Sequence, residues 1–145
     1  MNHLLENVFM SRELYQTILK PVCDKYQLTN TELMILLFLA NNPEYDTASA
    51  IVEKRRLTKS SISMAIRTLQ DRGLVVGAFH GGNRRSIHLK VCDAADTIIE
   101  DGRKAQESFS EILVDGFSEG EKEALKQYFI RVTANIDAYN KKTRK

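Results

Sequence analysis

The sequence predicts a mainly α-helical fold with one small β-hairpin. Apolar residues recur at three- and four-residue steps over most of the chain, the spacing of amphipathic helices. Only 7 Gly and 2 Pro occur among 145 residues, too few for an all-β protein with many tight turns. The segments 74–79 and 86–91 are instead typical of short strands, and the residues 80–83 between them have hairpin-turn chemistry.

Length and composition predict one soluble domain over residues 1–145. The hydrophobic fraction is 43% and the charged fraction 28%, both ordinary for a globular protein. No apolar run reaches the ~18 residues of a membrane span, and the first residues do not form a signal peptide. The two cysteines, Cys23 and Cys92, fit a reducing cytosol. We therefore expect a cytoplasmic protein without membrane contact.

Two helices are expected in the first third of the chain. The segment 4–26 is amphipathic, and Pro21 is expected to bend or shorten its helix because it removes an N–H and crowds the preceding turn. The segment 29–39 is apolar nearly all round and should lie in the core. Its start has the residues of a capping box, Thr29 and Glu32.

Two shorter helices, joined by a tight turn, precede the hairpin. Thr47 is expected to cap a helix that ends near residue 54, and Thr58 to cap a helix over 59–72. Gly73 should end the latter, because glycine takes the left-handed conformation without a Cβ penalty. Two long helices follow the hairpin, and the second begins with the capping box of residues 118–121.

This order of elements predicts a winged helix-turn-helix held between helical arms. A helix pair joined by a tight turn, with a hairpin after its second helix, places that second helix in the DNA major groove.

The charge is segregated along the sequence. Residues 54–90, here named the basic segment, contain nine Lys and Arg against one acid, a net charge of +8. Residues 91–123 contain ten acids and three bases, a net charge of −7. The basic segment is typical of a surface that binds a polyanion, although neighbouring surface helices can also differ in charge by chance.

The helix over 59–72 has one apolar side and one hydroxyl-rich side. A projection at about 100° per residue places Ile62, Ala65, Ile66 and Leu69 on the core side. Small hydroxyls allow close approach to DNA, and Arg can bind guanine through two hydrogen bonds. The alternative is an ordinary solvated helix, which would favour Glu and Lys pairs. The candidate DNA-binding residues here are Thr58, Lys59, Ser60, Ser61, Ser63, Met64 and Arg67.

The hairpin tip supplies a second candidate contact, formed by Asn83, Arg84 and Arg85. Gly81 and Gly82 keep the tip slim, which suits insertion of arginine into a narrow minor groove. Taken alone, a basic turn is also common on solvated surfaces.

The stretch 57–75, LTKSSISMAIRTLQDRGLV, followed by NRRSIHL at 83–89, resembles the MarR family of transcriptional regulators. The resemblance extends over nearly the whole chain. It implies a winged helix-turn-helix over residues 28–91, and helical dimerisation parts at 1–27 and 92–145. It also implies a homodimer that binds pseudo-palindromic double-stranded DNA, usually as a repressor that oxidants or small aromatic or anionic effectors release.

Three features depart from the pattern of this family. Asn83 replaces the usual wing aspartate, and Met64 stands where a basic residue is common. Val91 and Cys92 replace the usual Leu-Thr cap of the helix after the wing, so Asp93 is expected to serve as its N-cap.

No other chemistry has a comparable signal. The three histidines stand far apart, which argues against a metal site, and no catalytic motif or cofactor motif occurs, so we expect no enzyme. Cys23 is a possible redox thiol by the resemblance, and a small buried hydrophobe otherwise. The alternative function is a winged-helix protein–protein interaction module without sequence-specific DNA binding, which would have no reason to concentrate nine bases in the basic segment.

Overall fold

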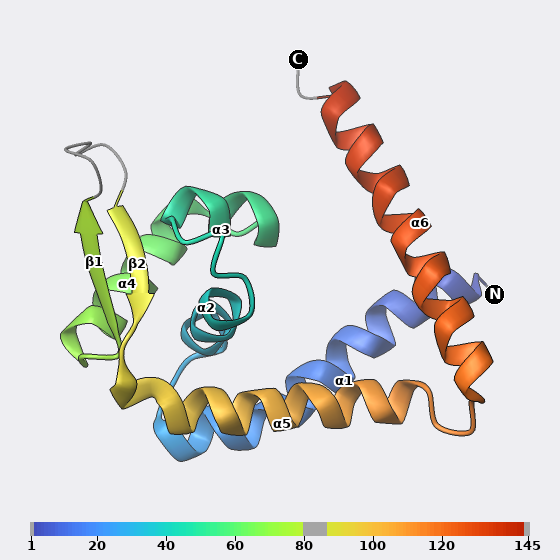
Figure 1. The fold of residues 1–145 in the computed structure, drawn as a ribbon, viewed down its shortest axis with the longest axis horizontal. Helices are drawn as coiled ribbons and strands as arrows, with labels where there is room; N and C mark the ends of the chain where they lie inside the picture. Colours follow the sequence, from blue (N-terminus) through green and yellow to red (C-terminus); the bar gives the residue numbers. More distant parts are fainter. Residues whose placement is uncertain (1, 80–86, 144–145) are drawn as a thin grey trace. The chain divides into compact units, whose positions relative to one another are not determined.

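The computed structural model describes residues 2–79 and 87–143 (Figure 1). It forms two compact units, residues 1–109 and 110–145. The predicted mainly helical fold with one antiparallel hairpin is confirmed. The elements in chain order are α1 (His3–Tyr26), α2 (Asn30–Asn41), α3 (Ala48–Arg55), α4 (Lys59–Asp71), β1 (Val75–Phe79), β2 (Ile87–Val91), the 3₁₀ turn η1 (Asp93–Ala95), α5 (Asp96–Leu113) and α6 (Glu119–Thr143). No helix in these residues is long and apolar enough to cross a bilayer.

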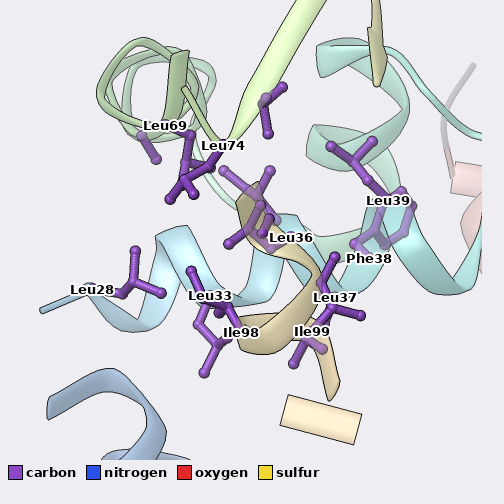
Figure 2. Packing of buried hydrophobic residues seen from close by; sticks show 14 of the residues in the cluster. Leu28, Leu33, Leu36, Leu37, Phe38, Leu39, Leu69, Leu74, Ile98 and Ile99 are labelled. Carbon is purple, nitrogen blue, oxygen red and sulfur yellow. The ribbon is translucent and has the colours of Figure 1, made fainter. Parts of the chain in front are cut away.

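Helix α2 is the centre of the core in the first unit. Its apolar side chains from Leu33 to Leu39 are buried or nearly so on every side. Figure 2 shows these side chains between Leu69 and Leu74 on one side and Ile98 and Ile99 on the other. Helices α1, α4 and α5 thus pack against a common apolar helix.

The predicted caps of α2 and α3 and the predicted end of α4 are confirmed. Thr29 Oγ1 accepts the Glu32 N–H at 3.1 Å while Glu32 Oε1 accepts the Thr29 N–H at 3.0 Å, a complete capping box. Thr47 caps α3 through the Ala50 N–H at 3.2 Å. Gly73 follows α4 with a φ of +72°, the left-handed conformation that glycine was expected to supply. These local bonds satisfy backbone groups that a helix end leaves free.

Pro21 was expected to bend or shorten the first helix, and it does not shorten it. Helix α1 continues through Pro21 to Tyr26. Val22 and Cys23, directly after the proline, are buried in the core. Their burial holds the final turns of the helix in place despite the hydrogen bond that Pro21 cannot donate.

The two strands pair in antiparallel register, with Val75 opposite Val91 and Gly77 opposite Leu89. Val75 and Leu89 lie in the core. The Cys92 N–H donates to the Leu74 carbonyl at 2.9 Å and closes the base of the hairpin. The predicted turn at 80–83 lies outside the described residues.

Asp93 is not the N-cap that the sequence predicted. It is the first residue of η1, whose N-cap is Cys92 and has no side-chain cap bond, and α5 begins only at Asp96. Ala95 in this turn is fully buried. Burial of Ala95, rather than a capping carboxylate, therefore sets the path of the chain into α5.

Helix α5 approaches α2 closely through a glycine. A Cβ added to Gly102 would lie 2.7 Å from Leu37 Cδ2 and 3.2 Å from Leu37 Cγ. One residue on, Arg103 donates to the Ala40 carbonyl at 3.1 Å and to Asn41 Oδ1 at 3.0 Å. The missing side chain at Gly102 thus allows these polar contacts at the end of α2.

In the second unit, α6 begins with the predicted capping box. Glu121 donates its N–H to Ser118 Oγ at 3.1 Å, and the Ser118 N–H donates to Glu121 Oε1 at 2.8 Å. No described residue of α6 is buried.

Replacement of Gly102 by alanine should lower the free energy of unfolding by about 1–3 kcal/mol, because the new methyl group overlaps the buried Leu37 side chain. Gly120→Ala is the matched control, since it adds the same methyl group to a helix position without a close neighbour. There alanine should stabilise by about 0.5–1 kcal/mol. Urea unfolding of both variants measures the difference. Equal stabilisation by both substitutions would contradict the close α2–α5 contact.

Candidate nucleic-acid interface

Helix α4 presents the two faces that the sequence predicted. Ile62, Ala65, Ile66 and Leu69 are buried in the core. The opposite side is exposed and comprises Lys59, Ser60, Ser61, Ser63, Met64 and Arg67. Met64 has 73% of its surface exposed, so its side chain is available to a ligand. Burial of one stripe therefore fixes which residues α4 offers to a ligand.

Hydroxyl groups surround the start of α4. Thr58 Oγ1 accepts the Ser61 N–H at 3.1 Å, and the Thr58 hydroxyl donates to Ser61 Oγ at 2.7 Å. Ser60 Oγ lies 3.4 Å from the same Thr58 oxygen. Thr58 is thus the N-cap, and its hydroxyl is already bonded within the chain. Ser60 and Ser63 remain the more available hydroxyls for a bound molecule.

Arg72 ties the end of α4 to the end of α1. Its guanidinium donates to the Tyr26 carbonyl at 2.8 Å and to the Gln27 carbonyl at 3.0 Å. These are carbonyls at a helix C-terminus, which favours cations. The sequence counted Arg72 only as one charge of the basic segment, because no local pattern indicates a partner so far away along the chain.

The end of α1 is held from α5 as well. Asp101 accepts hydrogen bonds from Lys25 Nζ at 2.8 Å and from the Tyr26 hydroxyl at 2.6 Å. These two donors keep the pKa of Asp101 below its usual range. Helices α1, α4 and α5 are therefore joined by polar contacts at one place.

Two further basic side chains of the basic segment lie against aromatic rings. The Lys54 ammonium is 4.8 Å from the centre of the Tyr45 ring, and the Arg55 guanidinium is 4.7 Å from the centre of the Phe38 ring. Such contacts hold a cation in place at modest energy. Part of the +8 charge thus has a structural role inside the protein.

The hairpin is anchored to the loop before α3. The Leu89 N–H donates to the Asp46 carbonyl at 2.7 Å, and His88 Nδ1 lies 2.8 Å from Asp46 Oδ1. Thr47 pairs with His88 as an isolated bridge beside β2. The sequence does not predict this contact, because Asp46 lies far back in the chain from His88. The anchor fixes the base of the wing relative to α3.

The predicted wing-tip contacts, Asn83, Arg84 and Arg85, lie outside the described residues. At the base of the hairpin, Lys90 is exposed on β2. The described strands thus establish where the wing begins, and the DNA contacts of its tip stay a prediction.

Cys23 has the environment of a structural thiol. It is buried, and its Sγ lies 3.5 Å from Asn30 Oδ1. Burial, followed by the nearby Asp24 carboxylate, raises the pKa of this thiol above its usual range. The reactive form of cysteine is the thiolate, so this environment opposes the possible redox role. Cys92 is half-buried. Among the residues that the structure describes, no group of His, Cys, Asp and Glu could hold a metal ion.

Comparisons with known proteins give one family-model match and several structural likenesses. Residues 26–86 match the sequence model described as MarR family. Among solved structures, the MarR protein from Peptoclostridium difficile is similar with a TM-score of 0.81 and 19% identity, over 99% of this chain and 93% of that one. The comparison with curated proteins gives no match.

Two similar structures contain DNA. A putative MarR family transcriptional regulator from Listeria monocytogenes, complexed with 26mer DNA, has a TM-score of 0.80 at 18% identity over 100% of this chain and 97% of that one. The MepR–DNA complex of S. aureus has a TM-score of 0.72 at 16% identity, over 93% and 96%. The predicted winged helix-turn-helix fold is confirmed by these likenesses.

The environment of Cys23 predicts slow thiol modification. In a Cys92→Ser variant at neutral pH, a disulfide reagent such as Ellman's should react with Cys23 far more slowly in the folded protein than in the unfolded chain, and the folded rate should rise with pH into the alkaline range. Cys23→Ser, which leaves only Cys92, is the matched control. A fast reaction of Cys23 in the folded protein at neutral pH would instead favour a redox role for this thiol.

Proposed function

With the MarR family match over residues 26–86 as its premise, we propose that this protein is a sequence-specific DNA-binding transcription regulator that binds a pseudo-palindromic operator as a homodimer. The observation that supports this most strongly is the exposed side of α4. It combines small hydroxyls with Lys59 and Arg67, next to a helix start that attracts phosphate.

Helix α4 would act as the recognition helix in the major groove. Ser60 and Ser63 are small enough for the helix backbone to approach the bases, and Arg67 has the length and the donors to bind guanine. The exposed Met64 offers an apolar contact that suits the methyl group of thymine. The wing residues Arg84 and Arg85 would enter the adjacent minor groove.

A second copy of the chain is proposed to cover exposed apolar surface on the terminal helices. Large apolar side chains are exposed at the start of α1, at the end of α5 and just after it, and along α6, and surfaces of this kind mark interfaces. They are Leu4, Leu5, Val8, Phe9, Met10, Ile112, Leu113, Phe117, Tyr128, Phe129, Ile130, Val132, Ile136 and Tyr139.

The family resemblance implies that the protein represses transcription. It also implies that a small aromatic or anionic effector, or stress, releases this repression. The alternative of a protein–protein module is less favoured, because relatives with this fold from Listeria monocytogenes and S. aureus are seen with DNA. The exposed cations of α4 also have no evident use in that alternative.

Mutation of the recognition helix and of the wing should have different effects. Operators would first be selected from random DNA with the wild-type protein. Arg67→Ala should then weaken binding by about 1–3 kcal/mol and relax base preference at particular positions. Arg85→Ala should weaken binding to all duplexes, most where the flanks are A·T-rich. Fluorescence anisotropy with the selected operator and a scrambled duplex measures both effects.

Met64→Arg is the companion variant for these measurements. It adds a charge to the same face of α4, so it should raise affinity for the scrambled duplex and shift base preference at one position in each half-site. Unchanged binding of both duplexes by the Arg67 and Arg85 variants would show that α4 and the wing are not the DNA surface.

Sedimentation at micromolar concentration should give the mass of a dimer. Replacing Phe129 and Ile136 on α6 together by Glu should shift the protein toward monomer, because charges would be buried in the interface. Glu substitutions at the exposed Lys126 and Lys141 are the matched control. A clean monomer mass for wild-type protein would contradict the proposed homodimer.

A further inference from the structure

A groove lies between the C-terminal end of α2 and one face of the hairpin. Its volume is about 560 Å³, which falls in the range of small-molecule sites. The described residues that line it include Leu39, Ala40 and Pro43 on the α2 side and Val76, Ala78 and Lys90 on the hairpin. This hollow is named the wing groove.

The strand register explains why the hairpin presents apolar side chains to the wing groove. Val76 lies opposite Lys90, and Ala78 lies opposite His88. Because side chains alternate along a strand, these four share the face that points away from the buried Val75. Val76 has 51% of its surface exposed, and Ala78 is exposed as well. This face of the hairpin therefore offers apolar surface to a ligand.

The charged side chains of the wing groove differ in their partners. Asp46 Oδ1 lies 2.8 Å from His88 Nδ1, so this carboxylate is already engaged. Lys90 is exposed, and no hydrogen bond or ion pair joins its ammonium to another residue in the ranges 2–79 and 87–143. An apolar hollow beside such an ammonium complements a ligand with an apolar body and one negative charge.

The apolar lining of the wing groove is aliphatic. None of its described residues is Phe, Tyr or Trp, so a planar ring would find no ring of these types on which to stack. A flexible hydrocarbon chain needs no such partner, because it gains from burial against any apolar surface. The lining therefore favours an aliphatic chain over an aromatic ring.

We propose that the wing groove binds a medium-chain aliphatic carboxylate, with its chain against Val76 and Ala78 and its carboxylate at Lys90. Asp46 also lines this groove, and its carbonyl accepts the Leu89 N–H at 2.7 Å, the contact that anchors the wing. A bound ligand would displace this anchor and so weaken DNA binding. The effect on DNA rests on the proposed function, whereas binding of the carboxylate does not.

Heptanoate is the probe for the free protein, and ¹H–¹⁵N NMR spectra of the full chain locate its site. It should bind with a Kd on the order of a millimolar, as suits a ligand of this size, and shift the amides of residues 76–78 and 88–91 most. Propionate, whose chain is shorter, should bind more weakly by on the order of tenfold. Benzoate, which has as many carbon atoms as heptanoate, and the cation heptylamine should also bind more weakly.

Each of these ligands can contradict one part of the proposal. Benzoate that binds as tightly as heptanoate would overturn the preference for an aliphatic chain. Heptylamine that binds equally would overturn the selection of an anion. Absence of heptanoate binding, or amide shifts confined to residues outside the wing groove, would overturn the site.

Two variants test the residues of the wing groove directly. Lys90→Gln should weaken heptanoate binding about two- to fivefold, because the carboxylate loses an exposed ion pair. Val76→Asp should weaken it by on the order of tenfold, because it puts a negative charge in the apolar wall. Lys126→Gln, at an exposed position of α6, is the matched control and should bind heptanoate like wild type. Wild-type affinity in Lys90→Gln would overturn the carboxylate contact, even if Val76→Asp lowers Tm.

Fluorescence anisotropy with the selected operator tests the effect on DNA. Saturating heptanoate should weaken operator binding by wild-type protein about fivefold or more, and this effect should be lost in Val76→Asp. Propionate at the same concentration controls for ionic strength, which itself weakens DNA binding. Unchanged operator affinity in heptanoate would overturn the link to the wing and leave the carboxylate site standing. Failure of the wild-type protein to bind any duplex would overturn the proposed function, while the NMR titration would still decide the site.

Discussion

Burial of α2 is the constraint on which the rest of the first unit depends. A helix that is apolar on every side is stable in water only when other elements cover all of it. Here α1, α4, α5 and the base of the hairpin provide that cover, and Gly102 lets α5 approach closely enough to do so. Because α4 contributes one stripe to this cover, its opposite side is left facing outward. The same packing that stabilises the fold therefore selects the surface that we propose binds DNA.

The orientation of α4 is fixed at both ends by polar contacts. Thr58 closes its start, and Arg72 joins its end to carbonyls of α1. The base of the wing is fixed in turn by Asp46, which accepts the Leu89 N–H and contacts His88. Reading of bases needs a helix held to within a fraction of an ångström, and hydrogen bonds of defined length provide such positioning better than apolar packing alone.

Local patterns in the sequence were sufficient to predict the helices, the caps at Thr29, Thr47, Thr58 and Ser118, and the two faces of α4, but not the start of α5. The cap at Thr29 and the turn at Gly73 depend on residues within a few positions, so their chemistry is visible in the sequence. The continuation of α1 through Pro21 was missed, because it depends on burial of Val22 against distant helices. Arg72, Asp46 and Asp101 were missed for the same reason, since each binds a partner that only the tertiary fold brings near.

Arg72 and Arg103 share an arrangement that affects how this protein unfolds. Each donates from one helix to main-chain carbonyls at the C-terminal end of another, Arg72 to the end of α1 and Arg103 to the end of α2. Helix ends ordinarily fray independently, with their last carbonyls turned to water. Here the last turn of α1 is bonded to the end of α4, and the last turn of α2 to α5. The ends of α1 and α2 are therefore expected to fray less than a helix end whose carbonyls face water.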